Sequence, residues 1–185
     1  MGAPTRAKVK VIHLLRHAKA EASGAGDSVH EDHVRPLAKR GEKAAAALAT
    51  HMKETGFTVD RIYCSTAIRA RQTLEPIRAV LPGVPTSFRE SLYLVDTETL
   101  FAFLQSLPDI VGSVLIVGHN PTSHHAALTL IDKVAAGEGE AMRELKHKFP
   151  TGALCSIECK ISKWASLAPK TGTLTGFLRP KDITD

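Results

Sequence analysis

The chain has 185 residues, 43% of them hydrophobic, and a formal net charge of +5, a size that suits one domain over residues 1–185 with a substantial core. Three cysteines without pairing spacing exclude a disulfide scaffold, and the absence of any apolar run near 20 residues argues against a membrane span, so we expect a cytoplasmic protein. The scattered basic residues favour an anionic partner without indicating nucleic acid. Residues 1–8 are expected to be disordered.

The first half of the chain alternates predicted strands and helices. Residues 9–15 (VKVIHLL) are apolar and rich in β-branched side chains, as a strand would be. After a glycine-containing loop, apolar or small residues at helical spacing predict a helix from Leu37 to Gly56, where glycine can end it. Residues 61–64 then predict a short strand, and residues 67–81 predict a second helix.

The pattern continues through the middle of the chain. Asp96 or Thr97 is expected to cap a helix that closes before residue 108. Residues 113–117 (SVLIV) are continuously apolar, which is typical of a strand covered on both faces of a parallel sheet. Thr122 is expected to cap a further helix reaching about Ala135.

The C-terminal part is more polar. Residues 136–149 show no clear period and are interpreted as a mobile connection, whereas residues 153–162 alternate apolar and polar side chains and predict an edge or outer strand. Residues 171–178 predict one more strand. The whole order indicates an α/β fold: a doubly wound, mostly parallel sheet with helices on both faces, in which ligands bind beyond the carboxyl ends of the strands.

Polar side chains follow three of these strands and are therefore expected to meet at one edge of the sheet. Arg16 and His17 follow the first strand, Ser65 and Arg69 follow the second, and His119 follows the apolar 113–117 segment. Arginines supply planar, permanently charged donors for phosphate oxygens, and histidines supply a nucleophile and a further donor. Phosphoryl transfer requires this combination, because its transition state spreads negative charge over three oxygens.

Three motifs give the chain a resemblance to a known family. They are Leu15-Arg16-His17-Ala18, matching an Arg-His-Gly signature; Ser65 to Thr73, matching Ser-x-x-x-Arg-x-x-Gln-Thr; and Gly118-His119. The chain resembles the histidine phosphatase superfamily, also called phosphoglycerate-mutase-like, and most of all its short phosphohistidine phosphatases. The resemblance extends over about residues 9–180, with Ala18 replacing the usual glycine.

The resemblance implies a role for each residue of the cluster. His17 would be the nucleophile, and Arg16, Arg69 and His119 would hold the phosphoryl oxygens, with His119 as a charged donor. Ser65 and Arg35 are further candidates for binding the substrate.

The proton donor is left open by the motifs, although many members of the family supply it as Glu or Asp. Glu90, which follows the second helix, is the first candidate. Glu21 and Asp27 in the first loop are rivals, and the short branch often has no obvious donor. A phosphohistidine substrate would need less help, because imidazole is a better leaving group than an alkoxide.

The favoured hypothesis is a phosphatase that hydrolyses a protein phosphohistidine through a covalent intermediate on histidine. The alternatives are a phosphatase of small phosphomonoesters and a non-catalytic phosphate-binding module. No metal or other cofactor is expected, since the arginines provide the positive charge that magnesium supplies elsewhere and no carboxylates cluster to hold an ion. Neither nucleic acid nor a membrane is expected as a partner, and the oligomeric state stays open.

Overall fold

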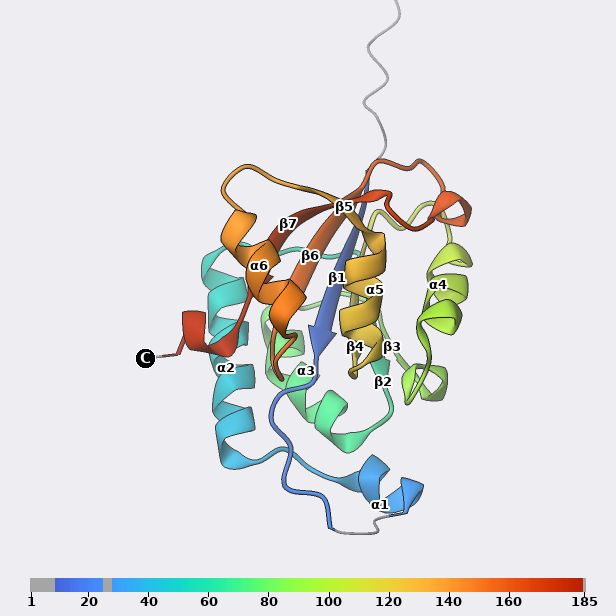
Figure 1. The fold of residues 1–185 in the computed structure, drawn as a ribbon. Helices are drawn as coiled ribbons and strands as arrows, with labels where there is room; N and C mark the ends of the chain where they lie inside the picture. The colour runs from blue at the N-terminus through green and yellow to red at the C-terminus, as the bar shows by residue number, and fades with distance from the viewer. Residues whose placement is uncertain (1–8, 25–27, 185) are drawn as a thin grey trace, which may run out of the picture.

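A seven-stranded sheet organises the computed structural model, which describes residues 9–24 and 28–184 (Figure 1). The strand order is β3-β2-β4-β1-β6-β7-β5. The strands are β1 (Lys10–Arg16), β2 (Arg61–Ser65), β3 (Thr86–Arg89), β4 (Ser113–Gly118), β5 (Ile131–Val134), β6 (Leu154–Cys159) and β7 (Gly172–Leu178). The expectation for residues 1–8 falls outside the described residues.

Helices cover both faces of this sheet, as the sequence predicts. Their bounds are α1 (Val29–Val34), α2 (Lys39–Glu54), α3 (Ile68–Val80), α4 (Thr97–Gln105), α5 (Thr122–Leu130) and α6 (Gly139–His147), with 3₁₀ turns η1 (Glu90–Leu92), η2 (Trp164–Ser166) and η3 (Pro180–Asp182). One buried cluster joins α2 and α3 to the sheet, and a second joins α4, α5 and α6 to it. The doubly wound α/β fold is confirmed.

Strand direction determines where the predicted site residues meet. β1 and β4 run parallel, and β2 runs parallel to both β4 and β3. The carboxyl ends of β1, β2 and β4 therefore lie at the same edge, and the polar residues that follow them are neighbours. β6 is antiparallel to β1 and to β7, so the sheet is mostly rather than wholly parallel.

The prediction of an edge strand over residues 153–162 is wrong. β6 lies between β1 and β7, and β3 and β5 are the edges. Its alternating polar residues suggested a wet face, but Ser156 is half-buried and its hydroxyl lies 2.8 Å from Nδ1 of the buried His13. A polar residue in this strand can therefore form a hydrogen bond inside the protein instead of facing solvent. Cys155 and Cys159, in the same strand, are fully buried.

Three local features also differ from the sequence interpretation: a helix end, an additional helix and a helix cap. The helix expected to reach Ala135 ends at Leu130, because β5 follows and pairs with β7. Residues 136–149 contain α6, an amphipathic helix anchored by the fully buried Leu145, rather than a mobile connection alone. Thr122 is the first residue of α5 and donates its hydroxyl to the carbonyl of Val95 instead of capping the helix. Asp96, in contrast, caps α4 as expected.

Within the described residues, no helix has the length and apolar character that crossing a membrane would take.

Candidate active site

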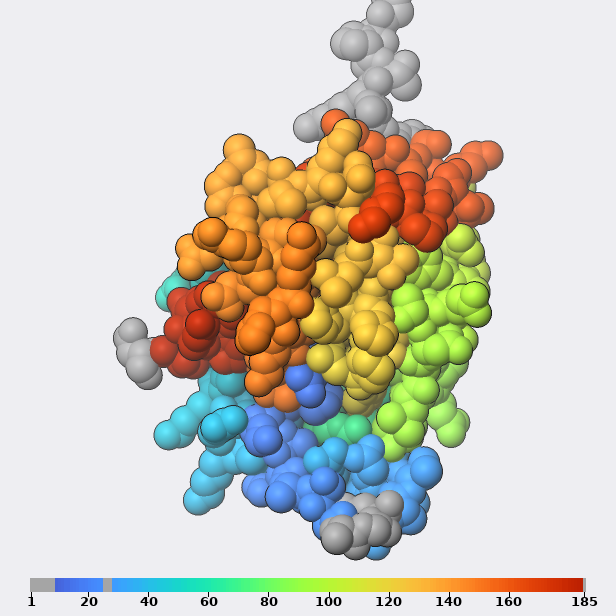
Figure 2. Space-filling model, in the orientation of Figure 1, coloured from blue at the N-terminus to red at the C-terminus, as the bar shows by residue number. Residues whose placement is uncertain are grey.

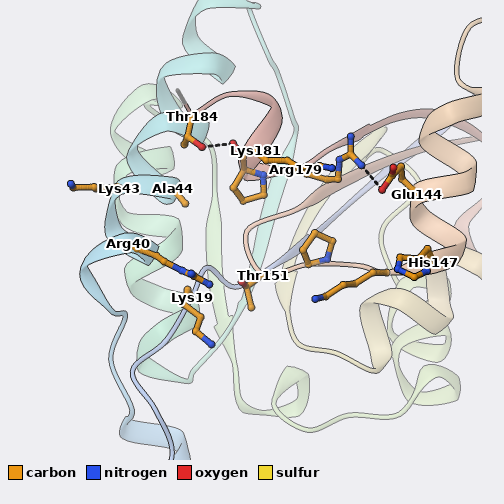
Figure 3. A pocket seen from close by; sticks show the side chains of 13 residues that line it. Lys19, Arg40, Lys43, Ala44, Glu144, His147, Thr151, Arg179, Lys181 and Thr184 are labelled. Atoms are coloured by element: carbon orange, nitrogen blue, oxygen red, sulfur yellow. Dashed lines mark hydrogen bonds and ion pairs between the residues drawn. The ribbon is translucent and has the colours of Figure 1, made fainter.

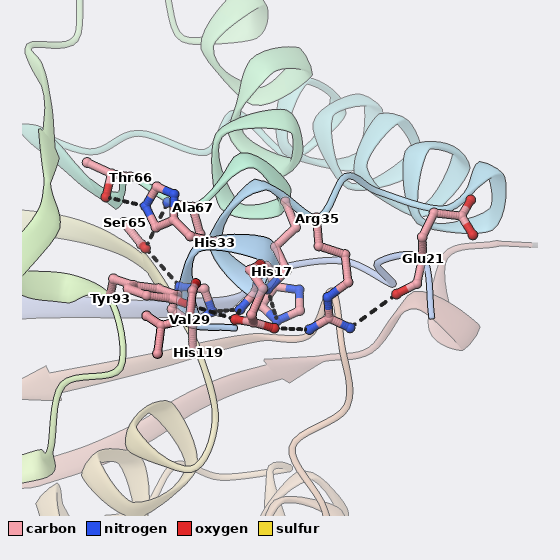
Figure 4. A network of polar contacts seen from close by, with 12 residues as sticks. His17, Glu21, Val29, His33, Arg35, Ser65, Thr66, Ala67, Tyr93 and His119 are labelled. Carbon is pink, nitrogen blue, oxygen red and sulfur yellow. Dashed lines mark hydrogen bonds and ion pairs between the residues drawn. The ribbon is translucent and has the colours of Figure 1, made fainter. Parts of the chain in front are cut away.

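A cavity of about 420 Å³ opens at the carboxyl ends of β1, β2 and β4. The residues that line it include five of the predicted site residues: Arg16, His17, Arg35, Arg69 and His119. Residues far apart in the sequence thus share one pocket, here called the catalytic pocket. Figure 4 shows the network of polar contacts around His17 and His119.

His17 is buried directly after β1 with its ring held in one tautomer. Its Nδ1 lies 2.7 Å from the carbonyl oxygen of Ala18, and its Nε2 lies 3.3 Å from Nε of Arg69. A carbonyl only accepts and a guanidinium only donates, so the proton is on Nδ1 and Nε2 keeps its lone pair. Burial lowers the pKa of His17 to about 4, assisted by the charge of Arg69 and opposed by the hydrogen bond to Ala18. At neutral pH the ring is therefore uncharged and Nε2 is able to attack an electrophile.

Arg69 lies in the first turn of α3 and is only 3% exposed. Besides its contact with His17, its guanidinium donates to the backbone carbonyl of Asp32 and, at 2.8 Å, to the Asp32 carboxylate. The ring of Tyr93 lies 5.9 Å from the guanidinium carbon. This planar donor is consequently fixed from several sides, as a preorganised phosphate ligand should be.

His119 follows β4 and faces His17, with the two ring centroids 5.1 Å apart. Its Nε2 lies 2.8 Å from the hydroxyl of Ser65, and its Nδ1 lies 3.5 Å from Nη2 of Arg69. Burial, with the nearby His17 and Arg69, lowers the pKa of His119 to about 3. At neutral pH the ring is therefore uncharged, and the role of His119 as a charged donor to phosphate stays a prediction.

Ser65 and Arg16 support the pocket differently. Ser65 is fully buried and does not line the cavity, and its contact with Nε2 of His119 orients that ring. Arg16 does line the cavity, and its Nη1 donates to the carbonyl of Phe149 at 2.8 Å. Within the described residues its buried Nε makes no hydrogen bond, which leaves a donor unsatisfied at the pocket.

Asp32 is a pocket residue that the sequence interpretation missed. It lies on α1 and supplies the sole carboxylate among the described residues that line the catalytic pocket. Its oxygens accept from Arg35 at 2.6 Å, from Arg69 at 2.8 Å and from the Tyr93 hydroxyl at 2.7 Å. Burial acts to raise the pKa of Asp32, but the hydrogen bonds from Tyr93 and Arg69 lower it to about 2. The sequence did carry a signal for α1, because Ser28 and Glu31 form a capping box.

Of the three expected proton donors, Glu90 and Glu21 are not brought to the pocket. Glu90 is exposed in η1 and does not line the cavity. The backbone carbonyl of Glu21 accepts from Arg35 at 3.1 Å, but its carboxylate points away from His17 (Figure 4). Asp27 lies outside the described residues.

The comparisons with known proteins agree with this geometry. Residues 12–95 match the sequence model of the histidine phosphatase superfamily (branch 1). An uncharacterized protein of Mycobacterium tuberculosis is 32% identical over 167 residues, which cover 90% of this chain and 100% of the relative. The chain belongs to the histidine phosphatase superfamily.

A curated phosphohistidine phosphatase and a solved SixA structure are also similar to the chain. SixA of Escherichia coli is 29% identical over 149 residues, covering 79% of this chain and 83% of SixA. A solved structure of the protein histidine phosphatase SixA with tungstate has a TM-score of 0.70 and 25% identity, and the match covers 94% of this chain and 99% of that one. The resemblance to short phosphohistidine phosphatases is confirmed.

In this histidine phosphatase, further residues of the second motif hold the pocket loops in place. The hydroxyl of Thr73 accepts from the backbone N–H of Ala18 at 2.9 Å and donates to the carbonyl of Arg69 at 2.6 Å. The side chain of Gln72 accepts from the backbone N–H of Leu37 at 2.7 Å. Thr73 therefore connects the nucleophile loop to the helix that carries Arg69. Ala18 fits this arrangement, since its side chain is completely buried.

Proposed function

We propose that this protein is a metal-independent phosphatase that transfers a phosphoryl group to His17 and then to water, with phosphohistidine on a protein as the favoured substrate. The observation that carries the proposal is the unprotonated Nε2 of His17, held 3.3 Å from Arg69 inside a cationic pocket. The similarity to SixA supports the substrate class, and the complex of SixA with tungstate supports the binding of a phosphate-like oxyanion.

The first step forms one bond and breaks another. Nε2 of His17 attacks phosphorus, the bond from phosphorus to the leaving nitrogen or oxygen breaks, and the leaving group takes up a proton. Arg16 and Arg69 hold the phosphoryl oxygens as negative charge spreads over them. In the second step water attacks the phosphohistidine, loses a proton, and releases inorganic phosphate and free His17.

Asp32 is the group that we assign to these proton transfers. Its carboxylate and the substrate phosphate compete for the same guanidinium of Arg69. When phosphate takes Arg69, Asp32 loses one of the hydrogen bonds that keep its pKa low and gains a negative neighbour, and both changes raise that pKa. The carboxyl group then becomes a proton donor only when substrate is bound, and its conjugate base accepts a proton from water in the second step.

His119 is the second residue whose protonation should change when phosphate binds. Its Nδ1 carries no proton, because it faces a guanidinium that can only donate. An incoming phosphate dianion favours the protonated ring, so that substrate binding would convert His119 into the charged donor suggested by the family resemblance.

Rapid-quench labelling tests the proposal. Wild-type protein mixed with labelled phosphohistidine peptide should accumulate an acid-labile, base-stable phosphoenzyme, and excess chelator should not change the rate. Phosphate binding without turnover of any substrate would favour the non-catalytic module. A strong preference for one small ester would favour the small-molecule alternative, and loss of activity in chelator with recovery on adding a divalent ion would contradict metal independence.

A further inference from the structure

A second, larger cavity of about 670 Å³ lies beside the catalytic pocket, and Lys19 and Thr151 line both. Its other walls come from α2, the end of α6 and the C-terminal η3 segment. Figure 2 shows these three parts meeting on one face above the loop that follows β1. We call it the basic cavity, after its six cationic residues: Lys19, Arg40, Lys43, Lys148, Arg179 and Lys181.

Most of this positive charge is unbalanced. Arg179 forms ion pairs with Glu144 and with Asp182, at 2.5 and 2.9 Å. The other five cations form no ion pair with any described residue. Glu144 is the one carboxylate among the described residues of the lining, and it is already paired. An unneutralised group of cations around a cavity attracts a negatively charged ligand.

The cations extend toward the catalytic pocket. In Figure 3 the side chains of Arg40 and Lys19 lie close to Thr151, which also lines the catalytic pocket, whereas Lys43 extends away. A ligand anchored at His17 can therefore continue past Lys19 and Thr151 into the basic cavity. An extended chain advances about 3.3 Å per residue, so the residues within a few positions of a bound phosphohistidine would reach it.

We propose that the basic cavity binds an acidic segment of the phosphoprotein substrate, next to the phosphorylated residue. This proposal rests on the proposed function, because it assigns a recognition site to the same reaction.

The arrangement of the cations favours separate carboxylates over one compact polyphosphate. Arg40, Lys148 and Lys181 are exposed and come from three different elements, in contrast to the buried and fixed Arg69. Flexible solvated cations suit carboxylates spread along a chain, whereas compact phosphate groups are best held by rigid donors. Pro150 and Pro180 add apolar surface on which the stems of acidic side chains can pack.

The test combines a charge-reversed variant with two readouts. Arg40→Glu with Lys148→Glu removes two cations that lie outside the catalytic pocket, and a glutamate at position 40 suits the first turn of α2. For a phosphohistidine peptide with acidic flanks, kcat/KM should fall about tenfold, mainly through KM, as two reversed charges in solvated contacts would produce. Turnover of an aryl phosphate and of a neutral-flanked peptide should stay within about twofold.

The matched control is Lys53→Glu with Lys163→Glu, which makes the same charge change at two exposed lysines outside both cavities and should behave as wild type. Anisotropy with a fluorescent, unphosphorylated acidic peptide provides a readout independent of turnover: binding should weaken in the double variant and at high salt.

Each outcome separates the two proposals. Arg40-dependent peptide binding without phosphohistidine hydrolysis would keep the basic cavity and reject the proposed substrate. Hydrolysis with equal kcat/KM for acidic and neutral peptides, and no effect of the double variant, would overturn the cavity proposal alone. Loss of inorganic tripolyphosphate binding in the double variant, with peptide binding unchanged, would also overturn it and would assign the cavity to a small polyanion.

Discussion

The catalytic pocket and the basic cavity are neighbours that use positive charge in opposite ways. Arg69 in the pocket is 3% exposed and fixed by Asp32, His17 and Tyr93, whereas Arg40 in the cavity is exposed and unpaired. Buried, prealigned donors act strongly on charge that develops during a reaction. Solvated cations act weakly and over longer distances, and salt screens them. The difference predicts that substitutions in the pocket reduce activity greatly at any salt concentration. Substitutions of cations in the cavity should reduce activity slightly, and only at low salt.

The largest effect is expected for His17→Ala. Removing the ring whose free Nε2 is held against Arg69 should abolish the phosphoenzyme and turnover of every substrate. Quenched-flow labelling should trap label in the wild type and, more weakly, in His119→Ala. Label retained by His17→Ala and missing from His119→Ala would reverse the roles of the two histidines.

Replacement of Arg69 should have the next largest effect. Arg69→Ala should lose about 100-fold or more in kcat, as expected for a lost preorganised donor. Arg69→Lys should recover little, because one ammonium group cannot replace three directed contacts with His17 and Asp32. Both losses should persist at high salt. Equal activity of Arg69→Lys and the wild type would show that the planar, two-pronged geometry of the guanidinium is unimportant.

Asp32→Asn should give an intermediate effect that depends on the leaving group. If Asp32 supplies the proton, kcat/KM, which reports the first step, should fall about tenfold or more for an alkyl phosphate and little for a nitrophenyl phosphate, whose leaving group needs no proton. If Asp32 merely competes with phosphate for Arg69, the variant should show a lower KM and an undiminished kcat. Steady-state kinetics with a series of leaving groups distinguishes the two results.

The sequence predicts the pocket's charged residues better than its supports. Arg16, His17, Arg69 and His119 each follow or begin an element whose type is clear from local periodicity, and the parallel sheet then brings them together. Asp32 escaped prediction because α1 is only six residues long and contains no buried residue, so hydrophobic spacing could not reveal it. Only the capping box signalled this helix.

In the C-terminal half, the sequence-based prediction failed for a different reason. The position of β6 between β1 and β7 depends on nonlocal pairing, and its alternating pattern is equally typical of an outer strand. The basic cavity was also missed, because its cations are scattered over residues 19–181 and become neighbours only through the fold. Scattered charge in the sequence therefore does not exclude a charged site.

Burial of His119 in the catalytic pocket should make the stability of the protein depend on pH. His119 has its pKa lowered from 6.5 to about 3 on folding, so between these values the unfolded chain binds the extra proton. Stability should be greatest above pH 6.5 and decrease as pH falls, by on the order of 1 kcal/mol or more from this ring by pH 5. Denaturant unfolding should show a shallower decrease with falling pH in His119→Gln than in the wild type.

The smallest expected effect belongs to a single cation of the basic cavity. Lys181 is exposed in η3, forms no ion pair with a described residue and does not line the catalytic pocket. Lys181→Glu should lower kcat/KM for an acidic-flanked phosphohistidine peptide only about two- to fivefold in dilute buffer, the range of one solvated charge contact. At about 0.5 M salt the difference should vanish, because screening then acts within a few ångströms. A salt titration of wild type and variant measures this convergence, with an aryl phosphate as the reference substrate. A loss that survived high salt, or that extended to the aryl phosphate, would mean that Lys181 acts on the catalytic pocket, and the division between the two clusters would fail.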